Sequence, residues 1–353
     1  MRSFILVTLM LLLPSVALAQ SERQQRLHKK VAGMCRSDIC QVSVSIVHLP
    51  SGEQVEVEAQ QPWPLASVFK VPVMIELARQ MQAQKGSLQL NTQLAIAGPD
   101  RCIGSGPLQH QPVGSKVSVQ RLVELMETRS DNTATDMLFR RIGLTSVDTW
   151  MHSLGCISSQ IYLTNRAAWL ISLGRSSDFK GLEPRQIAQK WQKMKPEARL
   201  EAALKAEQEN LKTSLSQFQA WEDQSAKDNT HEENVVVATT VDNLASAHDL
   251  AVVLGKLYQG ELLDKKWSDY CLGVLGRQSF NTRIPRNLPK GTRVYHKTGT
   301  IAGVVNDIGI IELQPGQGLV VVVLCKNVAE GCDAQAEQII ARISRAAYDA
   351  YKP

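Results

Sequence analysis

The sequence has few aromatic residues, no metal-binding spacing and no long run of like charge, and each absence excludes a class of protein. Aromatic residues make up 5% of the 353 positions, which disfavours a surface that stacks nucleic-acid bases. The net charge of +5 is spread along the chain, so no basic arm for nucleic acid is present. No C-x-x-C pair occurs and the seven histidines are scattered, which argues against a zinc site. The 44% hydrophobic and 21% charged residues are typical of a globular protein.

The first 19 residues are typical of a secretory signal peptide. Arg2 precedes a nearly continuous apolar run over 4–13, and Ala17-Leu18-Ala19 forms an A-x-A cleavage pattern. The run is shorter than the roughly 20 residues of a membrane span, and no later stretch is long and apolar enough to cross. We therefore expect an exported protein, periplasmic or secreted, that begins near Gln20 and has no stable membrane anchor. An uncleaved N-terminal anchor is the alternative.

Seven cysteines lie in the predicted mature chain, and export permits disulfide bonds. Because seven is odd, at least one cysteine stays free or pairs between chains. Short spacing favours the pairs Cys35 with Cys40 and Cys325 with Cys332, although spacing alone does not fix the connectivity.

Strands at both chain ends and helices between them predict an α+β fold. Apolar and polar residues alternate in 41–58 around the turn Pro50-Ser51-Gly52, which predicts a hairpin, and 304–311 and 319–324 predict two more strands. Helical signals occur in five segments: 68–80, 119–127, 132–140, 247–259 and 334–351. We therefore expect one antiparallel sheet formed from both chain ends, flanked by helices, with a mostly helical middle subdomain.

Residues 175–235 differ from the rest because they are polar and contain two helical stretches. Five apolar residues form a stripe in the second stretch: Leu200, Leu204, Leu211, Leu215 and Phe218. A stripe of this kind predicts an amphipathic helix folded back on the body of the protein. A lid or a surface for a partner is the alternative interpretation.

Ser67 and Lys70 form the first pattern that carries chemistry. They are three residues apart in a predicted helix, so they share a face, and the helix around them is apolar on nearly every side. Burial lowers the pKa of a lysine and moves it toward a useful base, so the two residues can act as nucleophile and base. A lysine that extends to the surface is the alternative for this motif taken alone.

Two further segments hold hydroxyl, amide and amino groups. Ser130-Asp131-Asn132 lies between two predicted helices and can direct polar side chains into a cleft, although all three residue types also cap helices. Lys297-Thr298-Gly299-Thr300 lies just before a predicted strand, where a lysine and hydroxyls can bind a carboxylate. Glycine there lets another backbone approach closely. A surface turn is the alternative for the second segment.

Together and in this order, S-x-x-K, S-D-N and K-T-G resemble the signature of class A β-lactamases and penicillin-binding proteins. The flanking residues agree, among them Pro64-Leu65-Ala66, Gly104-Ser105-Gly106 and Asn306-Asp307. The resemblance covers roughly 41–165 and 236–353. It implies the class A β-lactamase fold, with 20–353 as one catalytic domain that carries the polar helical insertion at about 175–235.

The resemblance also implies a role for each motif residue. Ser67 is the expected nucleophile, Lys70 takes its proton or helps to remove it, and Ser130 passes a proton to the leaving nitrogen. Asn132 is expected to bind the amide of the substrate. The segment Lys297-Thr298-Gly299-Thr300 is expected to bind the substrate carboxylate, with Lys297 as the charged group and Thr298 and Thr300 as hydroxyl partners. The backbone N–H groups of Ser67 and Thr300 form the expected oxyanion hole.

This sequence departs from the family pattern in the step that releases the acyl group. Class A β-lactamases carry E-P-E-L-N or a close variant after S-D-N, and its glutamate activates the water that releases the acyl-enzyme. No carboxylate occurs here between Ser153 and Ser177. Glu183 and Glu232-Glu233 follow later, but a helix N-terminus and a solvated polar loop account for them. Acylation is therefore predicted, whereas fast deacylation is not.

Three functions agree with these residues. The leading hypothesis is an exported serine hydrolase that opens β-lactams through an acyl-enzyme on Ser67. The first alternative is a D,D-peptidase acting on acyl-D-Ala-D-Ala, and the second is a slow-deacylating binder or sensor of β-lactams or peptidoglycan. We expect a monomer that uses no metal or organic cofactor, and the lifetime of the acyl-enzyme distinguishes the three.

Overall fold

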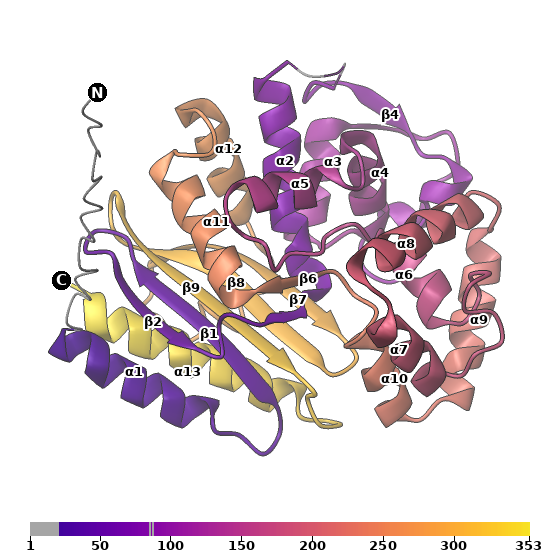
Figure 1. Ribbon diagram of the computed structural model, residues 1–353. Coiled ribbons are helices and arrows are strands. Elements are labelled where there is room, and N and C mark those ends of the chain that lie inside the picture. Colours follow the sequence, from indigo (N-terminus) through magenta and orange to yellow (C-terminus); the bar gives the residue numbers. More distant parts are fainter. Residues whose placement is uncertain (1–20, 85, 87) are drawn as a thin grey trace, which may run out of the picture.

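The computed structural model describes residues 21–84, 86 and 88–353, and it combines a five-stranded antiparallel sheet with a helical subdomain (Figure 1). The signal peptide predicted for residues 1–19 lies outside the described residues. Within the described part of the chain, no helix has both the length and the apolar character that a bilayer crossing needs.

Both ends of the chain contribute strands to the main sheet, as the sequence predicts. Its strands are β1 (Gln41–His48), β2 (Glu53–Val57), β7 (Arg293–Ile301), β8 (Val304–Gln314) and β9 (Gln317–Lys326). Their order is β2-β1-β9-β8-β7, so the N-terminal hairpin joins the C-terminal strands, with Val44 opposite Val323. The predicted strands at 304–311 and 319–324 are confirmed and are somewhat longer in the structure.

Helices cover both faces of this sheet, which explains the continuous apolar sequence of β9. Side chains alternate between faces along a strand. Val321 and Val323 therefore pack with α1 (Glu22–Cys35) and α13 (Asp333–Tyr351). Val320 and Val322 belong to the other core, together with α11 (Ala247–Gln259) and α12 (Lys265–Leu275). Figure 1 shows the two helical layers on either side of the sheet.

The helical subdomain is built around α2 (Lys70–Gln82), which is buried along most of its length. Helices α3 (Val119–Thr128), α4 (Asn132–Ile142) and α5 (Ser146–Ser153) pack against it. The other elements of the subdomain are α6 (Asn165–Ser172), which packs on α4, and two short strand pairs, β3 (Pro62–Pro64) with β6 (Leu244–Ser246) and β4 (Gln93–Ala95) with β5 (Lys116–Ser118). The helix predicted from 68 begins instead as a 3₁₀ turn, η1 (Ala66–Phe69). Pro72 lacks an N–H, which only the first turn of an α-helix tolerates, so α2 starts just before it.

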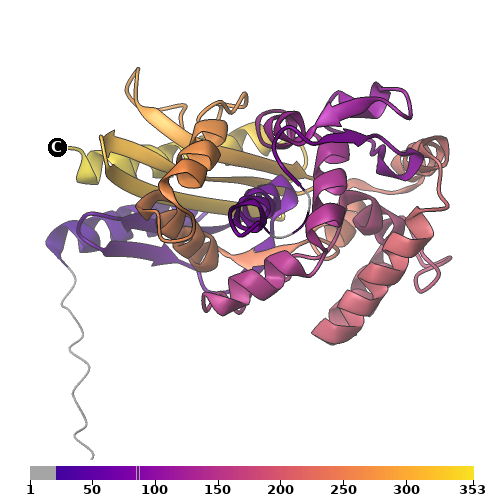
Figure 2. The same ribbon diagram turned by 90° about the horizontal axis from the view of Figure 1, so that it is seen from above.

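The insertion forms four helices on the side of the helical subdomain that is away from the sheet (Figures 1 and 2). They are α7 (Pro184–Lys193), α8 (Pro196–Asn210), α9 (Leu215–Asp228) and α10 (His231–Ala238). The predicted single apolar stripe is wrong, because α8 ends at Asn210 and Ser214 caps a new helix. Leu204 and Leu211 are 38% and 51% exposed, so the stripe does not form one buried face.

The predicted cysteine pairs are also wrong, because all seven thiols are free in the structure. The pairing of β1 with β9 places Val42 opposite Cys325, which brings Cys325 close to Cys40, and Cys35 is near enough to interact with both. A hydrogen bond between the thiols of Cys40 and Cys325 lowers the pKa of Cys40 to about 7 and raises that of Cys325. Strand register, which sequence spacing does not reveal, decides which thiols meet.

Candidate active site

Ser67 lies on the 3₁₀ turn η1, where two long-range contacts hold the backbone. Ala66 has a φ of +46°, a left-handed conformation that is unusual for a residue other than glycine. Its N–H donates to Asp242 Oδ2 at 2.6 Å. The Nδ2 of Asn306 donates to the carbonyl oxygens of residues 64 and 65 at 2.9 and 3.0 Å. These contacts fix the turn that presents a partly exposed Ser67 side chain.

Lys70 is fully buried at the start of α2 and is held by the second motif. Its Nζ donates to the backbone oxygen of Ser130 at 2.7 Å, to Ser130 Oγ at 3.1 Å and to Asn132 Oδ1 at 2.8 Å. Burial lowers the pKa of Lys70 to about 8, against the opposing influence of nearby carboxylates such as Asp131. At pH 7 about a tenth of this amine is therefore unprotonated and can accept a proton, and the fraction rises as the pH approaches 8.

Ser130 lies between the two buried lysines. Its Oγ accepts from Lys70 and from Lys297, each at 3.1 Å, and Lys297 also donates to the Thr298 carbonyl at 2.7 Å. Burial and the neighbouring Lys70 both lower the pKa of Lys297. The three motifs thus meet around one hydroxyl group, although they are far apart in the sequence.

The helix-cap interpretation of Ser130-Asp131-Asn132 is correct for its middle residue. Asp131 caps α4 by accepting from the N–H of Ala134 at 2.8 Å, and it also accepts from the N–H of Leu108 at 2.9 Å. Its capping role anchors the segment. Ser130, with a φ of +55°, and Asn132 are left to face the lysines.

The K-T-G segment lies just before β8, as the sequence predicts, and it is itself part of the edge strand β7. A Cβ at Gly299 would stand 2.7 Å from the oxygen of Leu65 and 3.0 Å from the nitrogen of Ser67. Only glycine therefore lets β7 approach the turn that carries Ser67. Thr300 follows at the same edge, and its Oγ1 accepts from Arg283 Nη2 at 2.6 Å.

Arg283 is a site residue that the sequence analysis missed. Its Nη1 donates to the carbonyl oxygens of Gly299 and Asn306 at 2.9 and 2.6 Å, so it holds β7 and β8 around the site. It belongs to the irregular segment between α12 and β7, where no periodicity marks it.

A cavity of about 400 Å³ opens at Ser67. Ser67, Asn132 and Thr300 line it, whereas Lys70, Ser130 and Lys297 are not among its lining residues. One wall of the cavity is formed by helix α6, whose first residue, Asn165, lines it. The cavity then reaches α9 and α10, so the insertion contributes to the same chamber as the candidate nucleophile.

The carboxylates considered in the sequence analysis do not line this cavity. Glu183 is exposed at the start of α7, and Glu233 caps α10 by accepting from Thr230 at 2.9 Å. Two other carboxylates, Asp242 and Glu222, do line it. Burial raises the pKa of Asp242 to about 7 and also raises that of Glu222. Their positions depend on tertiary contacts, and no local motif marks either residue.

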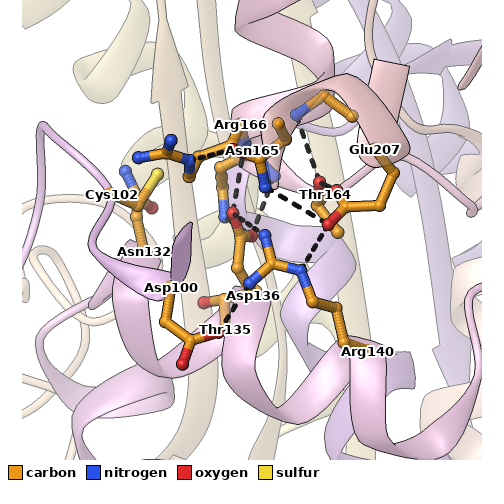
Figure 3. A network of polar contacts seen from close by, with 12 residues as sticks. Asp100, Cys102, Asn132, Thr135, Asp136, Arg140, Thr164, Asn165, Arg166 and Glu207 are labelled. Carbon is orange, nitrogen blue, oxygen red and sulfur yellow. Dashed lines mark hydrogen bonds and ion pairs between the residues drawn. The ribbon is translucent and has the colours of Figure 1, made fainter. Parts of the chain in front are cut away.

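Buried polar contacts hold the wall at α6 in place (Figure 3). The backbone N–H and Nδ2 of Asn165 donate to Asp136 Oδ1 at 2.9 and 2.8 Å. Glu207 of α8 accepts hydrogen bonds from Thr164 and from Arg140. Helix α8 of the insertion is therefore tied to the residues that form the cavity wall.

Arg166 is fully buried and adds further contacts to this network. Its guanidinium donates to Asn210 Oδ1, to the carbonyl of Arg101 at 2.5 Å and to the carbonyl of Thr213 at 2.6 Å. It also lies 4.0 Å from the ring centroid of Phe218. One arginine thus joins the cavity wall to the end of α8 and the start of α9.

Comparison with known proteins agrees with this geometry. The model of the beta-lactamase enzyme family matches residues 26–351. Beta-lactamase VEB-1 of Pseudomonas aeruginosa is 22% identical over 331 residues, which cover 91% of this chain and 89% of that protein. The solved TLA-1 extended-spectrum beta-lactamase has a TM-score of 0.68 at 20% identity and covers 94% of this chain and 100% of its own. A solved point mutant of PBP-A, in an acyl-enzyme complex with penicillin G, has a TM-score of 0.65 at 23% identity, with coverages of 93% and 96%. The predicted α+β fold class is thereby confirmed.

Proposed function

Because the chain belongs to the beta-lactamase enzyme family, we propose that it is a serine hydrolase that opens the β-lactam ring through an acyl-enzyme on Ser67. The observation that carries this proposal is the position of Ser130 Oγ, 3.1 Å from both Lys70 and Lys297, beside a cavity that Ser67 lines. A nucleophile, a base of lowered pKa and a proton-carrying hydroxyl are the groups that acyl transfer needs.

In the proposed acylation, the motif residues take the roles that the family resemblance implies. Ser67 Oγ attacks the lactam carbonyl while its proton passes to Lys70 Nζ. The N–H groups of Ser67 and Thr300 stabilise the oxyanion, a contribution worth about 10²–10³ in rate for each donor. When the carbon–nitrogen bond breaks, Ser130 Oγ donates its proton to the leaving nitrogen, and the proton held by Lys70 replaces it. Lys297 attracts the substrate carboxylate.

We propose that release of the acyl group is slow. Asn165, which is not a base, stands at the wall where α6 begins. The solved PBP-A mutant held as a penicillin G acyl-enzyme supports the idea that a protein of this fold can retain the acyl group. The same observation favours the second candidate function, a D,D-peptidase that acts on peptidoglycan peptides and is trapped by β-lactams.

The remaining parts of the proposal concern the location and state of the protein. We propose export to the periplasm or beyond, supported by the signal-peptide pattern of residues 1–19. We also propose a monomer that binds small substrates without a cofactor. Intact mass of the protein recovered from a periplasmic fraction tests the cleavage, since a mature chain starting near Gln20 is expected.

A single time course tests the activity and the rate of release. The mature protein is mixed with excess chromogenic β-lactam while colour and intact protein mass are followed together. We expect a burst of about one equivalent, the mass of the lactam on Ser67, and no reaction in Ser67→Ala. Steady turnover in the wild type would contradict slow release and favour a β-lactamase. Unchanged activity in Ser67→Ala would refute the acyl-enzyme.

The charge of Glu127 gives a prediction for the pH dependence of acylation. Both oxygens of this buried carboxyl lack a hydrogen-bond partner among the described residues. Burial raises the pKa of Glu127 itself to about 7, and above that pH its negative charge raises the pKa of Lys70 and of Lys297. In Glu127→Gln the pKa values of both lysines fall, so Lys70 loses its proton at a lower pH than in the wild type. The part of the pH profile in which the acylation rate rises with pH, its acid limb, therefore moves to lower pH. The limb is measured as acylation rate between about pH 5 and 9, the range in which a lysine of lowered pKa titrates.

Glu124→Gln provides the matched control, because Glu124 lies on the same helix and pairs with Arg277 at the surface. We expect it to leave the limb unchanged. A limb in Glu127→Gln that coincides with that of the wild type would show that the charge of Glu127 does not act on the group that determines the profile.

A further inference from the structure

The cavity at Ser67 continues into a chamber that the insertion walls. Beyond Asn165, α6 contributes Trp169 to the lining, α9 contributes Glu222 and Ser225, and Asn229 and Asn234 lie before and within α10. Asn132, the residue expected to bind the amide of the acyl group, lines this cavity, whereas Lys297 does not. A substituent on the acyl side of a substrate therefore shares the chamber with α9.

The ionisable side chains among the described residues that line this chamber are carboxyls only. Among the described residues no lysine, arginine or histidine lines the cavity, while Glu222 and Asp242 do. Both carboxyl oxygens of Asp242 already accept hydrogen bonds, from the backbone N–H groups of Ala66 and Asn243 at 2.6 and 2.8 Å. Glu222 is half-buried, and it forms no hydrogen bond or ion pair with any other described residue. Burial and the nearby Asp223 raise its pKa, and no cation of the described chain opposes them.

The groups beside Glu222 also suit a cation. Asn229 Nδ2 donates to Ser225 Oγ at 2.8 Å and to Asn234 Oδ1 at 3.1 Å. The side-chain oxygen of Asn229 is left as an acceptor without a partner among the described residues. Trp169 adds an aromatic ring to the same lining, and the faces of such rings attract cations. A carboxylate, an amide oxygen and an indole together favour a protonated amine.

We propose that this chamber is a subsite for an ammonium group on the acyl side of the substrate, with Glu222 as the residue that selects it. The proposal rests on the proposed function and deepens it. The preferred substrates are acyl donors whose acyl portion carries a free amine, such as a peptide with an unacylated diamino acid or a penicillin with an aminoalkyl side chain.

The test uses two penicillins with the same chain length, one ending in a primary amine and the other in a hydroxyl. The second-order rate of acylation is followed by intact mass for the wild type, Glu222→Gln and Asp223→Asn. We expect the wild type to prefer the amine by about tenfold, a typical contribution from a charged hydrogen bond. Glu222→Gln should lose this preference while keeping its rate with the hydroxyl compound.

Asp223→Asn is the matched control. It removes a negative charge from the next position of α9, and Asp223 does not line the cavity. It should keep the preference for the amine. Equal rates for both compounds in the wild type, or an undiminished preference in Glu222→Gln, would overturn the subsite.

Binding of the same two compounds to Ser67→Ala and to Ser67→Ala with Glu222→Gln separates the subsite from the proposed function. Tighter binding of the amine compound that is lost in Glu222→Gln supports the subsite. If the wild type is acylated by neither compound, that result refutes the proposed function but not the subsite. Equal binding of the two compounds by Ser67→Ala would overturn the subsite directly.

Discussion

Replacement of Lys70 by methionine is expected to slow acylation of Ser67 by about 10²–10⁴-fold, the usual contribution of a general base. Methionine keeps much of the length of the side chain but cannot accept a proton. The cavity has Asn165 and no carboxylate at its α6 wall, so the base expected to act on Ser67 is Lys70, which lies one turn further along the chain and contacts Ser130 Oγ. In the wild type the acylation rate should rise with pH through about 8, because the fraction of unprotonated Lys70 rises there.

The rate is measured as the appearance of acylated protein by intact mass under single-turnover conditions. Lys256→Met is the control, since Lys256 pairs with Glu261 on the surface and is expected to leave the rate unchanged. Circular dichroism and the midpoint of thermal unfolding establish that both variants are folded. A folded Lys70→Met variant that acylates at more than about a tenth of the wild-type rate would rule out the assigned base.

Replacement of Arg166 by methionine is expected to lower the free energy of unfolding by about 3–5 kcal/mol, as is typical when one partner of a buried charged network is removed. The buried side-chain oxygen of Asn210 and the partly buried carbonyl oxygens of Arg101 and Thr213 lose their donor. Asp136 also loses a nearby positive charge. The measurement is urea unfolding followed by fluorescence and circular dichroism.

Arg175→Met is the control for this prediction. Arg175 is exposed and lies 5.4 Å from the ring centroid of Trp221, so its replacement should cost about 1 kcal/mol or less. If Arg166→Met were no more destabilising than this control, the buried network would not be what attaches the insertion to the cavity wall.

The sequence indicated which motif residues the structure brings together, but it did not predict how the insertion packs. The three motifs could be identified because each is a local pattern, and the structure brings Ser67, Lys70, Ser130, Asn132 and Lys297 together. Their assigned roles stay predictions until the variants are measured. The leucine stripe was misleading because a periodic pattern does not reveal where Asn210 ends one helix and Ser214 starts the next.

The sequence by itself determined the α+β class, the strands at both chain ends and the order of the three motifs, since these depend on local periodicity and short spacing. It also showed that no carboxylate lies between Ser153 and Ser177. Only the tertiary structure decided which thiols meet, that Arg283 holds β7, and that Asp242 and Glu222 line the cavity. The contact of Asp242 with Ala66 joins residues 176 positions apart. Contacts of that range come from how the elements pack, which no local pattern of residues records.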